Sequence, residues 1–177
     1  PDTGGMNHSG DSLISYGGWG HGRWEFNSDS STNYYGKLKK DGSPQLQGMT
    51  RPSQSNLAGS YNLFALSFDR SANTISAWHN GTRFVNAVAD SSHGLALNQK
   101  FRIMANRGTG SNMQTLQGKM AEVLFLNSVA STDREKLEGY LAHKWGISSS
   151  LPSGHTYKSA APSAKVPLTA VNLGSKS

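Results

Sequence analysis

The sequence predicts an all-β fold, an antiparallel sandwich with one short helix near its C-terminal end. The chain has 177 residues, of which 35% are hydrophobic and 16% charged, with 20 glycines. This balance is typical of one domain made of short strands and many turns. Several short runs alternate apolar and polar residues and are separated by turn residues, whereas a single late segment has helical spacing.

The first strands follow an arm over residues 1–10 that is rich in Gly, Asn and Ser. Residues 12–16 and 23–26 are strand candidates, and four glycines in the loop 17–22 permit unusual backbone angles. The pattern predicts a hairpin with an adaptable tip. In the turn-rich stretch 28–60, the plausible strand positions are Tyr34, Tyr35, Leu38 and Leu46.

The middle of the chain shows the clearest strand pattern. Phe64, Leu66 and Phe68 share one face of a strand over residues 63–68, and a second strand is predicted over 74–79. Asn80-Gly81 is a strong signal for a tight hairpin turn before a third strand at 84–88.

Two more strands are predicted at 101–105 and 118–126. The second of these is apolar on both faces, so we expect it to lie centrally in a sheet. One face would hold Ala121, Val123 and Phe125, and the other Met120, Leu124 and Leu126.

A helix is predicted over residues 132–145. Thr132-Asp133-Arg134-Glu135 is a capping-box signature, and Leu137, Tyr140, Leu141 and Lys144 or Trp145 follow at helical spacing. Gly146 is placed to end the helix as its C-terminal cap. Residues 163–177 are a tail or, through Val166 to Leu173, an added edge strand.

Charge and cysteine content exclude several classes of protein. The net charge of +6 is scattered along the chain, and no nucleic-acid-binding motif accompanies it. Zero cysteines exclude disulfides, thiolate metal sites and cysteine nucleophiles. No apolar run is long enough to insert into a membrane. Since the sequence begins at Pro1, we expect a processed product, a domain of a longer protein, or an incomplete chain.

The run YNLFALSFDRSANTISAWHNGTRFVNAV resembles the paired strands of laminin-G-like and concanavalin A-like lectin/glucanase domains. KFRIMANRGTGSNMQTLQGKMAEVLFLN resembles a later strand, loop and strand of that family. STDREKLEGYLAHKWGISSSLPSGHTYKSAAP is similar to the helical end piece of its bacterial and bacteriophage members. The resemblance implies a two-sheet antiparallel jelly roll over residues 11–162. Family members have a further strand or two before Ser12, so residues 166–173 or a neighbouring chain would fill that edge.

Trp19 is the leading candidate for ligand binding. An exposed indole stacks on the C–H faces of sugar rings, and His21 and Arg23 would supply hydrogen-bond donors beside it. The alternative is that Trp19 packs as a lid on the rim. Trp24, Trp78 and Trp145 follow strand or helix patterns, so we expect them in the core.

The loop 106–112 is the second candidate. Loops at a sandwich rim bind ligands in the family, and Asn106, Arg107 and Asn112 offer amide and guanidinium groups. The alternative is a solvated loop.

No metal or catalytic site is predicted. Calcium remains possible at Asp29 with Asn27 and Asn33, or at Asp69 with Asn73, although turn capping is the simpler interpretation. The family's glucanases carry a Glu-x-Asp-x-x-Glu motif, and neither Glu25 nor Glu122 has such partners.

We therefore expect a non-catalytic carbohydrate-binding or adhesion module of a larger extracellular or cell-surface protein, with a glycan or cell-surface polysaccharide as partner. The alternative is a structural, decoration or fibre subunit of a virion, such as a bacteriophage particle, that binds neighbouring subunits through the sandwich edge. A polysaccharide-degrading enzyme ranks third.

Overall fold

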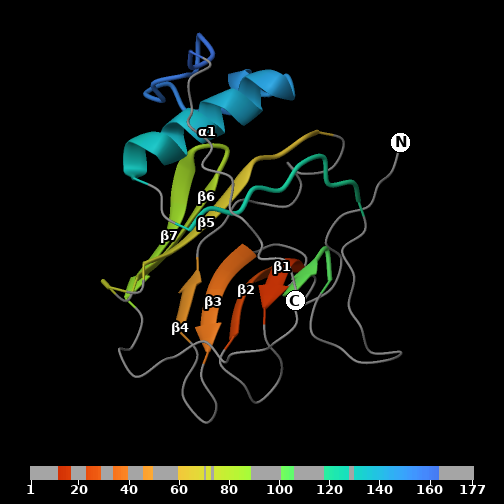
Figure 1. The fold of residues 1–177 in the computed structure, drawn as a ribbon, viewed down its shortest axis with the longest axis vertical. Coiled ribbons are helices and arrows are strands. Elements are labelled where there is room, and N and C mark those ends of the chain that lie inside the picture. The colour runs from red at the N-terminus through yellow and green to blue at the C-terminus, as the bar shows by residue number, and fades with distance from the viewer. Residues whose placement is uncertain are drawn as a thin grey trace, which may run out of the picture. The chain divides into compact units, whose positions relative to one another are not determined.

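The computed structural model has two small antiparallel sheets and one α-helix among the residues that it describes (Figure 1). The chain forms two compact units, Pro1–Lys119 and Met120–Ser177, with the sheets in the first and the helix in the second. The structure describes residues 12–16, 23–28, 34–39, 46–49, 60–69, 71–72, 74–88, 101–105, 118–127 and 130–163.

The first sheet has the strand order β4-β3-β2-β1-β8, and its neighbouring strands are all antiparallel. The predicted strands at 12–16 and 23–26 are confirmed, as are the strand positions around Tyr34 and Leu46. The strands of this sheet are β1 (Ser12–Tyr16), β2 (Arg23–Ser28), β3 (Tyr34–Lys39), β4 (Leu46–Met49) and β8 (Phe101–Ile103).

Strand β8 ends earlier than predicted. Met104 has a φ of +55°, a left-handed conformation that stops the extended strand at Ile103. The chain stays attached to β1 beyond this turn, because the hydroxyl of the buried Ser15 donates to the carbonyl of Ala105 at 2.9 Å. The last of the described strands is thereby fixed to the first of them.

The second sheet is a meander of β5 (Phe64–Asp69), β6 (Thr74–His79) and β7 (Thr82–Val88). The predicted Asn-Gly turn is confirmed. Asn80 and Gly81 have φ values of +47° and +79°, and positive values at both positions define the type I′ turn that suits a tight hairpin.

The register gives this sheet two unlike faces. Leu66 lies opposite Ala77 on the apolar face, which confirms the predicted alternation, and Ala77 is fully buried. Ser67 lies opposite Ser76 on the other face, and Trp78 shares that polar face. The prediction that Trp78 belongs to the core is wrong, since it is half-buried among small and polar residues.

The two sheets approach each other through corresponding strands. β4 lies near β7, and β3 lies near β6, with Cα atoms within 8 Å. The outermost strand of the first sheet therefore approaches the outermost strand of the second, and the next strands inward approach each other likewise.

The predicted central strand at 118–126 is not a strand. Residues 119–126 have no regular secondary structure, and Leu124, Phe125 and Leu126 are 38%, 51% and 46% exposed. Alternating apolar residues permit a strand, but a strand also requires a partner in a hydrogen-bonded ladder.

The predicted helix is confirmed as α1 (Ser131–Lys144), followed by the 3₁₀ turn η3 (Ser148–Ser150). The predicted capping box is wrong. The helix begins at Ser131, one residue earlier than predicted, and its N-cap residue Ala130 has no side-chain atom that could accept a hydrogen bond. At the other end Gly146 has a φ of +68° and donates to the His143 carbonyl, while Ile147 donates to the Ala142 carbonyl. These bonds form the glycine cap that the sequence predicts.

Within the described ranges, no helix is long and apolar enough to cross a membrane. Residues 166–173, proposed as an added edge strand, lie outside these ranges.

Candidate functional site

Most of the predicted ligand-binding residues lie outside the described part of the chain. These are Trp19, His21, Asn106, Arg107 and Asn112. The backbone of Arg23 is described: it begins β2, opposite Lys39 of β3. Since β1 and β2 pair down to Tyr16 and Trp24, residues 17–22 connect them at the end of a hairpin.

The described strands beside the two predicted binding loops run toward opposite ends of β1. β8 runs from Phe101, opposite Tyr16, to Ile103, opposite Ile14. Strand β8 therefore runs away from the hairpin end of β1. The described strands do not bring the loops 17–22 and 106–112 together, and their joint site stays a prediction.

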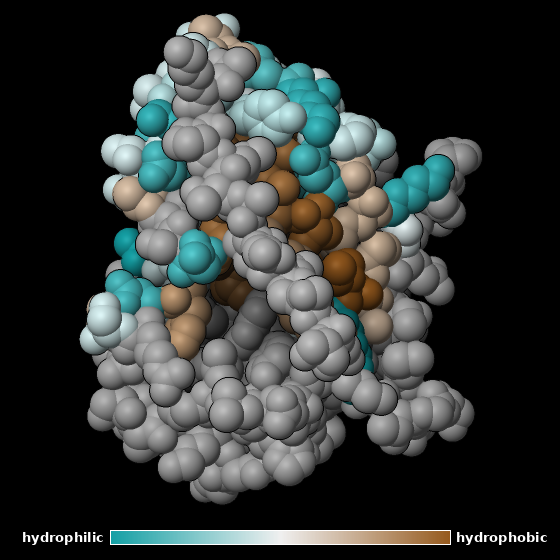
Figure 2. Space-filling model, in the orientation of Figure 1, coloured by the Kyte–Doolittle hydropathy of each residue, from teal (hydrophilic) through white to brown (hydrophobic). Residues whose placement is uncertain are grey.

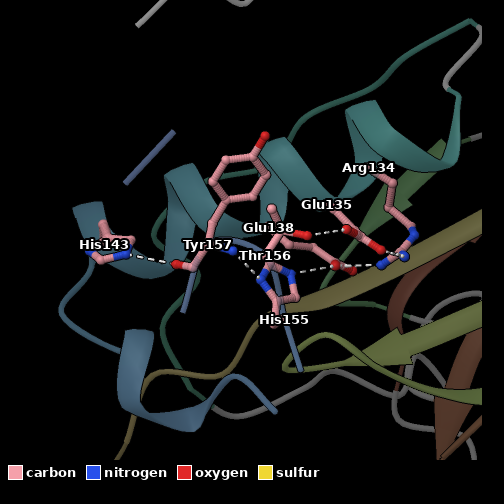
Figure 3. Close-up of polar contacts among 7 residues, drawn as sticks. All are labelled: Arg134, Glu135, Glu138, His143, His155, Thr156 and Tyr157. Carbon is pink, nitrogen blue, oxygen red and sulfur yellow. Dashed lines mark hydrogen bonds and ion pairs between the residues drawn. The ribbon is translucent and has the colours of Figure 1, made fainter. Parts of the chain in front are cut away.

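A polar cluster lies between α1 and the segment after it, residues 151–158, which we call the strap (Figure 3). Glu138 and His155 form its centre, and each side chain is only 3% exposed. Glu138 Oε2 accepts a hydrogen bond from Arg134, one helical turn earlier, and lies 3.4 Å from His155 Nε2. A carboxylate is costly to bury, and these two donors offset that cost.

A glycine allows the strap to lie so close. Gly139 faces Tyr157, and a Cβ atom at position 139 would lie 2.3 Å from the Tyr157 Cβ. No real pair of such carbon atoms approaches so closely. Gly139 therefore sets the distance at which Glu138 meets His155.

Further hydrogen bonds fix the strap along the helix. The His143 ring contacts the Tyr157 carbonyl at 2.9 Å, and the Thr156 hydroxyl donates to Glu135 at 3.0 Å. Lys158 folds back and donates to the carbonyls of Ser149 and Leu151. Together with Leu151, which is 2% exposed, these contacts close the strap on the helix.

The geometry of this cluster suits a structural tie better than catalysis. The backbone amide of Tyr157 donates to His155 Nδ1 at 3.2 Å, so the ring carries its proton on Nε2 and presents it to Glu138. Both ring nitrogens are thus engaged internally. Glu138 Oε1 is buried with no hydrogen-bond partner among the described residues, the one such side-chain atom there.

A second carboxylate, Glu122, fixes the segment before the helix. Its Oε2 accepts from Lys144 Nζ at 2.9 Å and from Trp145 Nε1 at 3.1 Å. The hydrogen bond from Lys144 lowers the pKa of Glu122, and the same bond raises the pKa of Lys144. Both shifts favour an ion pair, whereas a general acid needs a raised carboxyl pKa.

The aromatic residues beside this ion pair are only partly covered. Lys144 Nζ lies 5.4 Å from the Tyr140 ring centre and 5.7 Å from that of Trp145. Tyr140 is 42% exposed and Trp145 is half-buried, so the prediction of Trp145 as a core residue is wrong. The indole nitrogen of Trp145 donates a hydrogen bond to Glu122, which explains why the ring is only partly buried.

In the first unit, an amide and imidazole cluster supports the β6–β7 turn. His79 Nε2 lies 2.8 Å from Asn62 Oδ1, and the His79 ring stacks on Phe64 with ring centres 4.7 Å apart. Burial lowers the pKa of His79 from 6.5 to about 4, so the ring is neutral near pH 7. Asn80 fixes the turn by accepting from the Leu63 amide through its side chain.

Asp69, one of the possible calcium ligands, caps a turn instead. Its Oδ1 accepts from the Ser71 amide and hydroxyl and from the Ala72 amide, at 2.7 to 3.0 Å. The hydrogen bond from the Ser71 hydroxyl is the main cause of its lowered pKa. Among the residues with described positions, no group of three or more His, Cys, Asp or Glu side chains can hold a metal ion.

The Glu138–His155 cluster was not predicted from the sequence, although the sequence contains a signal for one part of it. Arg134 and Glu138 are spaced four apart on a helix, a pattern that predicts an ion pair. Gly139 and Ala142 on the same side mark a face with room for close packing. Nothing local indicates His155, which comes from another segment.

No family model, no curated protein and no solved structure matches this chain.

Proposed function

We propose that the chain is a non-catalytic recognition module of an extracellular or cell-surface protein, built as a jelly-roll sandwich and binding a glycan. The sandwich is supported by the two antiparallel sheets and by the approach of β4 to β7 and of β3 to β6. Two sheets stacked face to face produce such a correspondence.

The observation that carries the recognition role is the register of the β1–β2 hairpin. Pairing of Tyr16 with Trp24 makes residues 17–22 the connection at one end of the first sheet. A glycine-rich loop with one tryptophan, held at both ends by paired strands, is suited to stacking on a sugar ring. Glu138 and Glu122 of the second unit, by contrast, are engaged with their own neighbours.

A glycan array with the full chain tests this function. Wild-type protein is expected to bind a defined set of glycans, and Trp19→Ala to lose at least about tenfold in affinity with an unchanged melting temperature. Tyr61→Ala is the matched control, because Tyr61 is 49% exposed and lies outside the predicted site. Unaltered binding by Trp19→Ala would remove Trp19 from the site, and an array without any bound glycan would refute the function.

Assembly into a larger particle, such as a virion, is the second candidate function. Figure 2 shows hydrophobic side chains of described residues gathered on part of the visible surface. Strand β8 is at an edge of its sheet, and its Phe101 and Ile103 are 40% and 45% exposed. Exposed edge strands with apolar side chains pair readily with other chains.

Light scattering distinguishes the two functions. A stable oligomer that dissociates on Ile103→Lys favours assembly, since a charge on an edge strand opposes pairing. A monomer of 19.0 kDa at all concentrations favours the recognition module.

A further inference from the structure

The Asn80-Gly81 turn at the end of the β6–β7 hairpin is also a reactive dipeptide. The side-chain amide of an asparagine is open to attack by the backbone nitrogen of the next residue, and glycine shields that nitrogen least because it has no Cβ atom. Asn80 is the one asparagine in the sequence that a glycine follows. Both residues are half-buried, and the turn is described with its contacts.

The Asn80 side chain is anchored to the residues just before β5. Its Oδ1 accepts from the Leu63 amide at 2.8 Å, and the Asn80 amide donates to the Leu63 carbonyl at 2.8 Å. Its Nδ2 donates to Asn62 Oδ1 at 3.4 Å, and Asn62 is itself held by a bond to the Ser60 carbonyl at 3.1 Å. Asn80 thus pairs with Leu63 as a strand residue would, with its side chain in place of a backbone carbonyl.

These contacts oppose the reaction. A five-membered ring closes only if the Asn80 carboxamide turns onto the Gly81 nitrogen, whereas its oxygen and its nitrogen are both held by residues 62 and 63. The carboxamide is released when this end of the hairpin separates from Leu63, which is a local opening and does not require the whole chain to unfold. The rate of reaction therefore depends on the opening of one end of the second sheet.

The reaction itself cannot be reversed by closing the hairpin again. The Gly81 nitrogen bonds to Asn80 Cγ, the Cγ–Nδ2 bond breaks, and the amide leaves as ammonia with the proton that the Gly81 nitrogen gives up. Water then opens the succinimide ring at either carbonyl and gives an aspartate or an isoaspartate. Each product has a carboxylate that cannot donate to Asn62 Oδ1. The isoaspartate also adds one carbon to the main chain of a two-residue turn, whose geometry does not accommodate it.

We infer that Asn80 is a deamidation site gated by Leu63 and Asn62, and that its conversion releases the β6–β7 turn from the start of β5. Water is the co-reactant, and the reaction needs neither an enzyme nor a ligand. This modification goes beyond the proposed recognition function and does not depend on it.

Ageing of the full chain in mildly alkaline buffer, followed by peptide mass spectrometry, tests the gate. In the chain unfolded by guanidinium chloride, Asn80 is expected to convert faster than Asn127, which precedes a serine. In the folded chain Asn80 is expected to convert at least about tenfold more slowly than in the unfolded one, because the anchored side chain reacts only from the open state. Equal rates in the folded and unfolded chains would refute the gate, and an Asn80 that does not convert even when unfolded would remove the site.

Asn62→Ala takes away the acceptor of the Asn80 amide. It is expected to speed the conversion in the folded chain by about threefold to tenfold, as the loss of one hydrogen bond would. Asp69→Ala is the matched control, because Asp69 caps the β5–β6 turn at the opposite end of the same strands. It is expected to change the rate by less than about twofold. Equal acceleration by the two variants would refute local gating in favour of a general loosening of the sheet.

Hydrogen exchange tests the release of the turn. The isoaspartate form is separated from the unmodified chain by its added negative charge, and its β6–β7 amides are expected to exchange at least about tenfold faster. Asn80→Asp carries the carboxylate without the additional main-chain carbon, so its exchange is expected to lie between the two. Equal exchange in the isoaspartate form and in the unmodified chain would refute the release.

Discussion

The two units are stabilised in contrasting ways. The sheets of the first unit are held by backbone ladders, and the second sheet presents polar side chains on one face, where Trp78 and Arg83 lie. In the described part of the second unit, two polar side chains of α1 and the strap turn inward, where Glu138 meets His155 and Gly139 admits Tyr157. Paired strands fix the sheets through their backbones, whereas a buried polar cluster specifies how two segments fit together.

The largest effect is expected from removing the centre of the buried cluster. Glu138→Ala leaves Arg134 and His155 without their carboxylate, and we expect a loss of about 3 kcal/mol in the free energy of unfolding. Urea unfolding measures this loss, and hydrogen exchange of the strap amides shows whether the strap is the part that opens. Glu135→Ala is the control, since this carboxylate is 38% exposed, and we expect a loss below about 1 kcal/mol. Equal losses in Glu138→Ala and Glu135→Ala would contradict a stabilising role for the buried cluster.

A similar test addresses close packing. Gly139→Ala places a Cβ atom against Tyr157, and we expect a loss of about 2 kcal/mol from overpacking. Gly154→Ala provides the control, because a Cβ atom there meets nothing within 4 Å. Thermal unfolding of the two variants gives the difference. If Gly139→Ala is as stable as wild type, the strap does not lie against the helix as described.

The first unit is expected to respond to pH through His79. Its folded pKa of about 4 is below the unfolded value of 6.5, so the unfolded chain binds more protons between these values. The neutral ring's contribution is therefore fully present above pH 6.5 and is lost as the pH falls toward 4. We expect it to be at most about 2 kcal/mol for a half-buried ring.

His79→Gln removes this contribution while Asp69 and Glu122 continue to titrate. Denaturant titrations from pH 4 to pH 7 should therefore show wild-type stability falling more steeply than that of the variant. Parallel curves for the two proteins would mean that His79 does not titrate as its burial implies.

The smallest effect concerns the helix end. Gly146→Ala forces a left-handed backbone on a residue with a Cβ atom, at a cost of about 1 kcal/mol. Thermal unfolding against Gly154→Ala, the same exchange at a site without a positive φ, isolates the conformational cost. A stability equal to that control would argue against the glycine cap.

Local signals in the sequence predicted most of the elements. Alternation in residues 63–68, the Asn80-Gly81 turn and the glycine after the helix each act over a few residues, and the structure has all three. Residues 118–126 show where this fails, because alternation does not supply a strand partner.

Long-range contacts could not be predicted in this way. Glu138 and His155 are distant in sequence, and nothing near either residue indicates the other. The position of Trp78 depended on strand register. The sequence marked Phe64, Leu66 and Phe68 as the apolar face of β5, but only the pairing of β6 with β5 shows that Trp78 lies on the opposite, polar face of the sheet. Of the predicted binding residues, the structure describes only the backbone of Arg23, so that site rests on topology.

The pairing of β8 with β1 has a consequence for synthesis on the ribosome. β1 acquires β2 as soon as the hairpin emerges, yet its other edge receives β8 only after residue 103 has been made. Until then the edge of β1 displays unpaired amides and carbonyls, which can pair with another nascent chain. A fragment that stops before Phe101 is therefore expected to aggregate, and completion of this sheet has to wait for most of the chain to be translated.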